Sequence, residues 1–466
     1  MDRSPAETQP DVSGTGALAK MIRAVDYDSL PKPAVRAAKR LIVDSLGCML
    51  GGWSLPQGRK MVRLMSPLTG PGGATVAGAG DRRDPAHAAC LNAYLANLLD
   101  FDDTYFGHPG ATAIPPALAL AEDRHLSGRR FMTAVVAAYE AGLRVADAIK
   151  PSRPRLKKVM GLATWQIFCA AAASAKALGL GPEETVQALS LAGVHAPVAS
   201  VRKLGLKVGR ASWMKNNYGW PVLGGVLAAF LAEDGFVGDP TLFDGPTGFW
   251  VMAGSDRFRP AALSGGLPKT WAVERVSLKP YTACRHISPT LDAVFFLVRE
   301  TKLAPEQIER VEVESFFELA ENYSFFPGEP MSVPFSAPCL IALAALGLPP
   351  GPAWFDPALL TDPRVRGLAG RVSLEIWPEA DRLYSRVKRE LISRVTLFAA
   401  GRVRYRQEVR IPKGDPRNPL SDEEVRQKFL ALAGPVLGRY EAARVHETLM
   451  RLEELDDCAT LLAGSG

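Results

Sequence analysis

Hydrophobic residues recur at helical spacing through most of the first half of the chain. Between residues 31 and 52, Val35, Ala38, Ile42, Leu46 and Met49 follow one another at steps of three and four, and the run ends at two glycines. This is the pattern of an amphipathic helix and its stop signal. Ala- and Leu-rich segments bounded by Gly or Pro predict further helices at residues 85–99, 113–122, 130–148, 164–178, 182–192 and 222–233. We therefore expect a helical domain over residues 16–268, after a flexible N-terminus at residues 1–15.

The pattern changes near Lys269, where apolar and often β-branched residues begin to alternate with polar ones. Such alternation is typical of half-buried strands, and it predicts strands at residues 273–279, 310–316, 372–376, 394–398 and 403–411. Two segments among them, 289–301 and 337–346, keep helical spacing. Residues 269–411 are therefore expected to form a smaller α+β domain.

The chain returns to helical composition after Pro412. A turn-rich connector at residues 413–419 is followed by Ser421 and three acidic residues, which is a good helix start. Because residues 412–466 resemble the first half in composition, we expect them to pack back on the helical domain. The predicted fold is mainly α, with a large all-helical domain built from both chain ends and a smaller α+β domain.

Length, charge and cysteine content narrow the functional classes. At 466 residues the chain exceeds the size of a single core, and its formal charge of +6 is small and interleaved, so nucleic-acid binding is not expected. No apolar run approaches the roughly 20 residues of a membrane span, and the polar start lacks a signal-peptide pattern, so we expect a cytoplasmic protein without a membrane partner. Six scattered cysteines without CxxC spacing argue against a zinc or iron–sulfur site.

The first group of candidate functional residues lies in one loop between two predicted helices. Asp100, Asp102, Asp103, Thr104 and His108 fall within nine residues, and polar groups of this kind are costly to bury without partners. Loops held by a rigid scaffold are also where catalytic groups collect. The competing interpretation is that Asp102 and Asp103 only cap a helix.

Two further groups are basic. Lys215 stands between Trp213 and Trp220, where partial burial would shift its pKa toward acid–base work, and Lys203 belongs to a basic run just upstream. The competing interpretation for both lysines is a solvated basic loop.

The third group precedes the helix predicted at residues 289–301. Lys279, Arg285 and His286 come just before Ser288, which we interpret as the helix N-cap. A helix N-terminus with basic side chains beside it suits a carboxylate ligand. The alternative is an ordinary strand–turn–helix junction with a basic surface.

Taken in order, these pieces resemble the MmgE/PrpD family, which includes 2-methylcitrate dehydratases, cis-aconitate decarboxylases and iminodisuccinate epimerases. The matching segments are residues 43–48, 99–104, 108–110, 213–215, 228–235, 243–245, 279–281, 284–285, 335–336, 414–420 and 428–429. The resemblance implies that the smaller domain is a lid, that the active site lies between the two domains, and that the protein is a homodimer. It places family catalytic positions on Asp100, Thr104, His108, Lys215 and Lys279, and a substrate-carboxylate contact on Arg285.

Three positions depart from the family pattern. No histidine stands near Met160, Cys339 replaces the tyrosine of the decarboxylase-like members, and Ser288 stands where many members have a histidine. The missing tyrosine counts against decarboxylation.

The sequence therefore predicts a lyase that dehydrates a small, 2-methylcitrate-like polycarboxylate without a metal or other cofactor. His108 and Lys215 would share the base and acid roles, Asp100 and Thr104 would orient them, and Lys279, Arg285, His286 and Lys203 would hold the substrate. The alternatives are a decarboxylase, an epimerase, or a homologue that binds polycarboxylates without turning them over.

Overall fold

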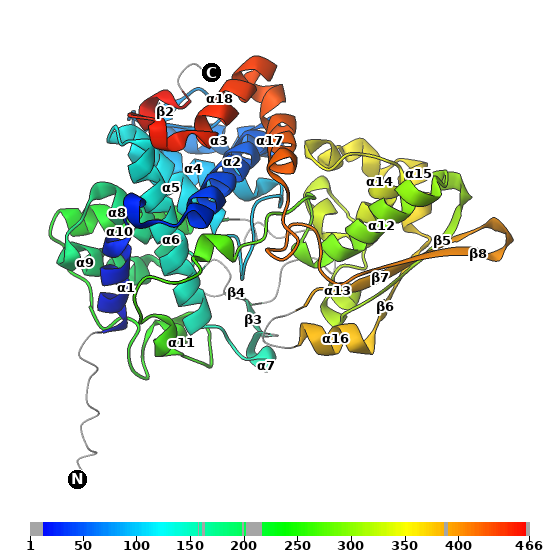
Figure 1. Cartoon of the computed structure of the whole chain (residues 1–466), viewed down its shortest axis with the longest axis horizontal. Coiled ribbons are helices and arrows are strands. Elements are labelled where there is room, and N and C mark those ends of the chain that lie inside the picture. Colours follow the sequence, from blue (N-terminus) through cyan, green and yellow to red (C-terminus); the bar gives the residue numbers. More distant parts are fainter. Residues whose placement is uncertain are drawn as a thin grey trace, which may run out of the picture.

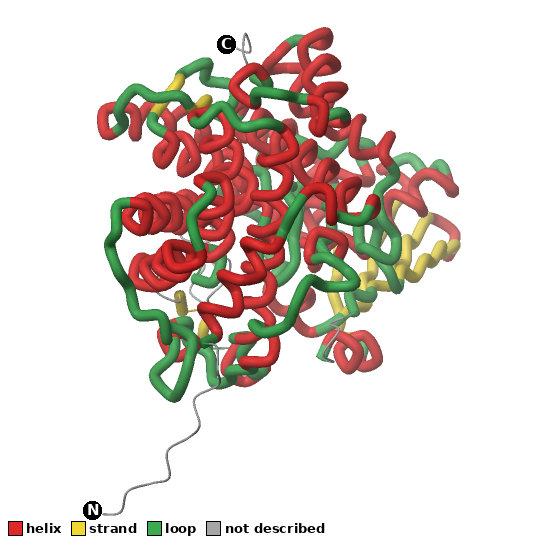
Figure 2. The backbone as a smooth tube through the Cα atoms, turned by 60° about the vertical axis from the view of Figure 1, so that its left-hand side comes forward, coloured by secondary structure: helices red, strands yellow, loops and turns green. Residues whose placement is uncertain are grey.

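Helices dominate the computed structural model, which describes residues 13–156, 158–160, 164–197, 200–201, 217–385 and 390–462. In Figure 1 the helices of the first half fill one large body, and Figure 2 shows the longer strands gathered at one side of the molecule. The predicted fold class, a large helical domain with a smaller α+β domain, is confirmed.

The larger domain is a stack of helices that carry many alanines. Its N-terminal part contains α1 (Gly14–Ala24), α2 (Lys32–Ser54), α3 (Pro56–Met65), α4 (Pro85–Leu98), α5 (Gly110–Asp123), α6 (Gly128–Ala148), α7 (Arg153–Leu156), α8 (Ile167–Leu178), α9 (Pro182–His195), α10 (Gly219–Glu233) and α11 (Phe249–Met252). Every helix predicted in this half is present within a few residues of its expected ends, whereas α1, α3, α7 and α11 were not predicted. Alanine side chains allow close helix contact, and α5 is buried from Gly110 to Glu122.

The smaller domain contains one four-stranded sheet covered by helices. The strands β5 (Ile308–Ser315), β6 (Val372–Ile376), β7 (Ser393–Ala399) and β8 (Val403–Val409) lie in the order β6-β5-β7-β8. Only β5 and β6 are parallel. The helices are α12 (Ser288–Thr301), α13 (Phe317–Asn322), α14 (Ala337–Ala345), α15 (Pro363–Ala369) and α16 (Pro378–Tyr384), and α12 packs against β7, β8 and α14.

The strand predicted at residues 273–279 is wrong. Residues 272–274 form a 3-10 turn, and Ser277 makes an isolated bridge with Thr104 instead of joining the sheet. Val273, Val276 and Leu278 belong to the core of the helical domain. Their alternation therefore reflects burial against helices.

The C-terminal segment closes the helical domain, as predicted. Helices α17 (Asp422–Leu437) and α18 (Arg439–Met450) follow the connector, and α17 packs on α2, so the C-terminal helices lie against the N-terminal helices in Figure 1. The Ser421 hydroxyl accepts from the Glu424 amide, and the Glu424 carboxylate accepts from the Ser421 amide, which confirms the expected capping box. The exact domain boundaries at residues 268 and 411 stay predictions. Leu278 still belongs to the hydrophobic core of the helical domain, whereas Ala283 belongs to that of the smaller domain.

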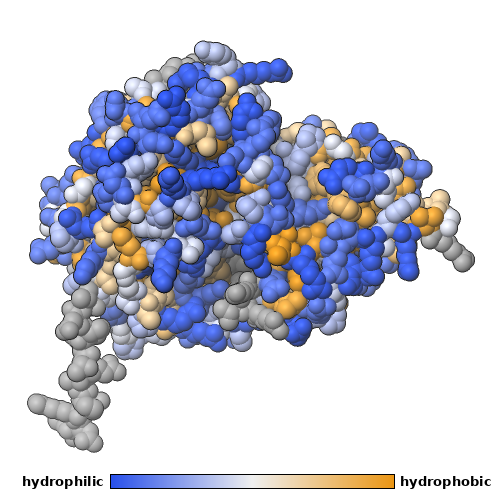
Figure 3. Space-filling model, in the orientation of Figure 1, coloured by the Kyte–Doolittle hydropathy of each residue, from blue (hydrophilic) through white to orange (hydrophobic). Residues whose placement is uncertain are grey.

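The face shown in Figure 3 is mostly hydrophilic, with smaller hydrophobic areas. Within the described ranges, no helix is both long enough and apolar enough to cross a membrane.

Two segments connect the domains: the outgoing one around Leu278 and the returning one at residues 413–419. They touch each other at Gly414. The Leu278 amide donates to the Gly414 carbonyl at 3.0 Å, and the Gly414 amide donates to the Asn418 carbonyl at 2.9 Å. Gly414 has φ +87°, and a Cβ added there would lie 1.8 Å from the Leu278 carbonyl oxygen. Only glycine allows this approach of the outgoing and returning segments.

Replacing Gly414 with Ala should therefore destabilise the protein more than the same change at Gly347. Gly347 also has positive φ, at +72°, but a Cβ added there meets no described atom within 4 Å. We expect about 1 kcal/mol of lost unfolding free energy for Gly347→Ala, from the backbone conformation alone. Gly414→Ala should lose a further ~1–3 kcal/mol from the steric clash. Urea denaturation of both variants measures the difference, and equal losses would contradict the close contact.

Candidate functional site

The acidic loop between α4 and α5 is held by backbone hydrogen bonds to the end of α4 and to the segment around Ser277. Asp100 begins it with φ +49°, a left-handed conformation that Asp tolerates better than most residues, and its amide donates to the Asn97 carbonyl at 2.9 Å. Thr104 exchanges backbone hydrogen bonds of 2.8 and 3.0 Å with Ser277. The loop is therefore tied to the segment that leads into the α+β domain.

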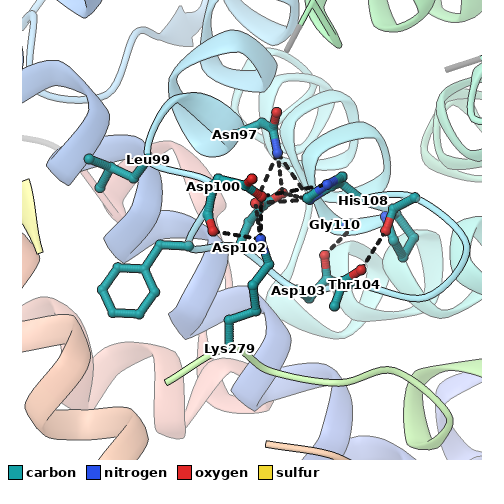
Figure 4. A network of polar contacts seen from close by, with 12 residues as sticks. Asn97, Leu99, Asp100, Asp102, Asp103, Thr104, His108, Gly110 and Lys279 are labelled. Atoms are coloured by element: carbon teal, nitrogen blue, oxygen red, sulfur yellow. Dashed lines mark hydrogen bonds and ion pairs between the residues drawn. The ribbon is translucent and has the colours of Figure 1, made fainter. Parts of the chain in front are cut away.

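A buried lysine neutralises two of the loop carboxylates. Lys279 is 2% exposed, and its ammonium contacts the Asp100 carboxylate and donates to the Asp100 carbonyl at 2.5 Å. The Asp102 carboxylate lies 3.9 Å from the same nitrogen. Burial lowers the pKa of Lys279, but Asp100 and Asp102 outweigh burial, so the pKa is raised and the side chain stays cationic. Figure 4 shows Lys279 reaching the aspartates from the side opposite Asn97.

His108 is oriented by Asp102. Its Nδ1 lies 3.1 Å from both Asp102 oxygens, and Asn97 Nδ2 donates to the same carboxylate at 2.9 and 3.1 Å. The Asn97 amide nitrogen also lies 3.0 Å from Nδ1, but its protons are directed to the two Asp102 oxygens. With the carboxylate as the acceptor at Nδ1, the tautomer with its proton on Nδ1 is favoured. The other ring nitrogen, Nε2, then carries a lone pair and lies 3.7 Å from Asp100 Oδ1. This arrangement fits a general base.

Two groups support the His108 ring and backbone from behind. The His108 amide donates to Gln166 Oε1 at 3.0 Å, and the Tyr218 ring lies with its centroid 5.4 Å from that of His108. Burial, reinforced by the negative charge of Asp102, raises the pKa of Tyr218, so its phenol stays neutral. The ring of His108 is therefore fixed on several sides.

Asp103 has a structural role, as the helix-capping interpretation proposed. Its Oδ1 accepts from the Gly110 amide at 2.8 Å, at the start of α5, and its Oδ2 accepts from the Tyr139 hydroxyl at 2.7 Å. Burial and the nearby Asp102 raise the pKa of Asp103 to about 8. The capping interpretation does not hold for Asp102, which contacts Asn97 and His108.

The ammonium of Lys428, from the C-terminal helix α17, joins three segments. It lies 2.6 Å from Asp44 Oδ1 on α2, and it donates to the carbonyls of Phe101 at 2.6 Å and Lys279 at 3.0 Å. The Lys428 side chain is 7% exposed and that of Asp44 is 1% exposed. One side chain therefore holds both the acidic loop and the Lys279 segment in place.

The basic side chains of the α+β domain stand where its first helix begins. Arg285 and His286 lie in a 3-10 turn (Arg285–Ile287) that runs directly into α12, and Arg285 Nη1 donates to the Tyr105 carbonyl at 3.3 Å. The prediction of Ser288 as N-cap is wrong. Ser288 already has helical dihedral angles, and Ile287 is the cap residue, because the turn continues into the helix.

The structure brings most of the predicted site residues together and changes the role of one. Asp100, His108 and Lys279 form one buried cluster, with Arg285 bonded to the same loop. The Thr104 hydroxyl donates to the Gly107 carbonyl at 3.0 Å, so in the structure it holds the loop rather than contacting His108 or Lys279. Lys203 and Lys215 lie outside the described residues.

Sequence reasoning missed several residues of this cluster. Asp102 was counted among the polar groups of the acidic loop, with helix capping as the competing interpretation, but it was given no part in orienting His108. Asn97 and Gln166 carry no local signal, because each is one polar residue in an apolar helical stretch. Lys428 lies on a helix with many charged residues, and its partners are more than 140 positions away in the sequence.

Asp100, Asp102 and His108 also have the donor types of a metal site, since their ligand atoms lie within 4.8 Å of one another. The Lys279 ammonium already contacts Asp100 and approaches Asp102, so it supplies a positive charge where a metal ion would bind. A divalent ion bound to these carboxylates would be repelled by that ammonium. The donor set therefore fits a lysine-neutralised acid–base cluster better than a metal centre.

Comparison with known proteins adds an independent observation. Two family models match, the MmgE/PrpD N-terminal domain over residues 16–260 and the MmgE/PrpD C-terminal domain over residues 281–454. A cis-aconitate decarboxylase of Mus musculus is 26% identical, over 96% of this chain and 92% of that protein. A cis-aconitate decarboxylase-like protein of Aspergillus oryzae is 25% identical over 98% of both chains. A 2-methylcitrate dehydratase of Cupriavidus necator is 26% identical, over 89% of this chain and 92% of that protein.

Replacing Lys428 with Met should destabilise the fold strongly. The change leaves the Asp44 carboxylate buried without its counter-charge and removes the donor of two loop-holding hydrogen bonds. Breaking a buried pair in this way costs about 3–5 kcal/mol of unfolding free energy. Lys413→Met is the matched control, because Lys413 pairs with Glu424 at 2.9 Å on the surface, where a pair contributes about 0–1 kcal/mol. Chemical denaturation should separate the two variants, and similar losses would contradict the role assigned to Lys428.

Proposed function

The chain belongs to the MmgE/PrpD family, and on that premise we propose that it is a metal-independent hydro-lyase that dehydrates a small hydroxy polycarboxylate of the 2-methylcitrate type. The observation that carries the proposal is the buried cluster of His108, Asp102, Asp100 and Lys279. It combines an oriented base with a fixed cation.

Dehydration of such an acid requires three kinds of group. A base must take the proton next to a carboxylate, cations must stabilise the enolate-like charge that develops, and an acid must protonate the departing hydroxide. His108 Nε2 suits the first role, because Asp102 holds the proton on Nδ1. Lys279 and Arg285 suit the second role, and the predicted contribution of Lys203 would add to it. Lys215 stays predicted to share the base and acid roles with His108.

Decarboxylation is the second candidate, since two of the relatives named above are a cis-aconitate decarboxylase and a protein named as like one. The same base and cations would serve that reaction. Cys339 favours dehydration, because it replaces the tyrosine of decarboxylase-like members and is fully buried in the core of the smaller domain.

We further propose that the protein acts as a homodimer. Helix α10 is apolar on most of its surface, yet Trp220 is 58% exposed and Leu227 is 42% exposed. Val194, at the end of the neighbouring α9, is also exposed. An apolar surface of this kind suits a second copy of the chain. Sedimentation equilibrium should give twice the chain mass, and a single chain mass would refute the dimer.

Proton NMR in D₂O tests the reaction directly. The purified protein is incubated with 2-methylcitrate, citrate, cis-aconitate and iminodisuccinate in the presence of EDTA. We expect loss of water from a hydroxy acid that continues after chelation. Loss of carbon dioxide would establish the decarboxylase instead, and deuterium uptake without net consumption would establish an epimerase. Activity that EDTA abolishes would refute metal independence.

In the same assay, His108→Gln should lower turnover by about 10²–10⁴-fold if His108 is the proton carrier. His87→Gln is the matched control, since His87 lies on α4 and pairs with Asp84 near the surface. A loss below about tenfold for His108→Gln would remove it from the base role.

A further inference from the structure

Four side chains that can each give and take a proton form a continuous chain in the α+β domain. The Cys284 thiol donates to the Tyr323 hydroxyl at 3.4 Å and lies 3.7 Å from His286 Nδ1. The Tyr323 hydroxyl is 3.3 Å from His286 Nδ1, and the Tyr384 hydroxyl is 3.2 Å from His286 Nε2. We refer to Cys284, Tyr323, His286 and Tyr384 as the α+β relay.

The Cys284 end of the relay faces the acidic loop. On one side of Cys284, the Thr282 hydroxyl donates to the Leu99 carbonyl, and on the other side Arg285 donates to the Tyr105 carbonyl. These carbonyls stand on either side of the Asp100–Thr104 segment. The thiol is therefore on the α+β side of the cluster that contains His108.

The hydrogen bonds of the relay can run in either direction. In one direction the thiol donates to Tyr323, Tyr323 donates to His286 Nδ1, and His286 Nε2 donates to Tyr384. In the other direction Tyr384 donates to His286 Nε2, His286 Nδ1 donates to Tyr323, and Tyr323 donates to the Cys284 sulfur. When each of these protons passes along its hydrogen bond, the first arrangement is restored and a proton has moved from the Tyr384 end to the Cys284 end. Both arrangements need only a neutral imidazole, since one ring nitrogen donates while the other accepts.

The two tyrosines of the relay are buried, and burial disfavours their negatively charged phenolate forms. Tyr323 and Tyr384 are 6% and 8% exposed, and the Phe316 ring stacks on Tyr384 at 4.3 Å between centroids. Burial, with the nearby Cys284, raises the pKa of Tyr323 well above its usual value. The phenol therefore passes a proton on instead of holding a negative charge.

We propose that Cys284 is the proton carrier on the α+β side of the site, and that Tyr323, His286 and Tyr384 resupply its proton. This inference rests on the proposed dehydration. His108 Nε2 takes the proton from carbon, the electrons of that C–H bond form the C=C bond, and the C–O bond breaks. The thiol proton joins the departing hydroxide to give water. The thiolate regains a proton through Tyr323, His286 and Tyr384, Tyr384 takes a proton from solvent at its exposed edge, and His108 returns its proton to solvent, so the cycle closes.

The proposal separates two steps that NMR measures independently. In D₂O, removal of the substrate proton by His108 appears as deuterium uptake, and departure of hydroxide appears as loss of water. Cys284→Ala and Tyr323→Phe should slow water loss while uptake continues, so uptake per water lost should rise by about 10²-fold, the lower end of the range for loss of a general acid. This ratio does not depend on the fraction of protein that is folded.

Matched controls make the same substitutions outside the relay. Cys458→Ala changes a buried thiol of the helical domain, and Tyr405→Phe changes a tyrosine on β8. Neither should change the ratio. A ratio that also stays at the wild-type value in Cys284→Ala and Tyr323→Phe, or falls there, would overturn the relay.

A second measurement does not depend on turnover. It can therefore test the relay even if the proposed dehydration is wrong. Alkylation of Cys284 by iodoacetamide, followed by mass spectrometry, gives the pH midpoint of the thiol. Loss of one hydrogen bond to the thiolate in Tyr323→Phe should raise this midpoint by about half to one unit. Citrate should slow the alkylation in the wild type. If no acid is turned over, the proposed function fails, while an unchanged midpoint in Tyr323→Phe overturns the relay by itself.

Discussion

Three aspartates buried within four residues of one loop are the constraint around which the structure is arranged. Isolated carboxylates cannot be buried at this density, so each needs a counter-charge or a proton. Lys279 supplies the charge for Asp100 and Asp102. Burial raises the pKa of Asp103 to about 8, and its two oxygens accept from the Gly110 amide and the Tyr139 hydroxyl. Lys428 then holds the backbone of the loop and of the Lys279 segment together. The crossing of the two connectors and the return of the C-terminal helices both bring these lysines to the loop.

The candidate site residues lie on both sides of the contact between Leu278 and Gly414, some in the helical domain and some in the α+β domain. Lys279 is the first residue after Leu278, where the outgoing connector touches Gly414. His108, the proposed base, lies wholly on the helical side, whereas Arg285 and Cys284 lie at the start of the α+β domain. Both sides are tied to the same loop through the carbonyls of Leu99 and Tyr105. A substrate held between them would therefore meet the base and the cations in a geometry set by one loop.

Features that depend on neighbouring residues in the sequence could be predicted. Helical spacing located the main helices, and the density of polar groups pointed to the loop that starts at Asp100. Long-range partners could not be predicted in this way. Asn97 looks like one polar residue of a helix, and Lys428 looks like a surface lysine until Asp44, Phe101 and Lys279 are brought beside it by folding. The false strand at residues 273–279 shows the same limit, because alternating burial against helices has the same pattern as alternating burial in a sheet.

The proposed division of labour accounts for different activities among similar chains. Dehydration and decarboxylation of citrate-like acids both develop charge next to a carboxylate, and Lys279 would stabilise that charge in either case. The fate of the charged intermediate would then depend on the group that faces it from the other domain. In this chain we propose that this group is Cys284, at the end of the α+β relay that faces the acidic loop. The helical side would set the shared first step, and the α+β side would decide which bond breaks.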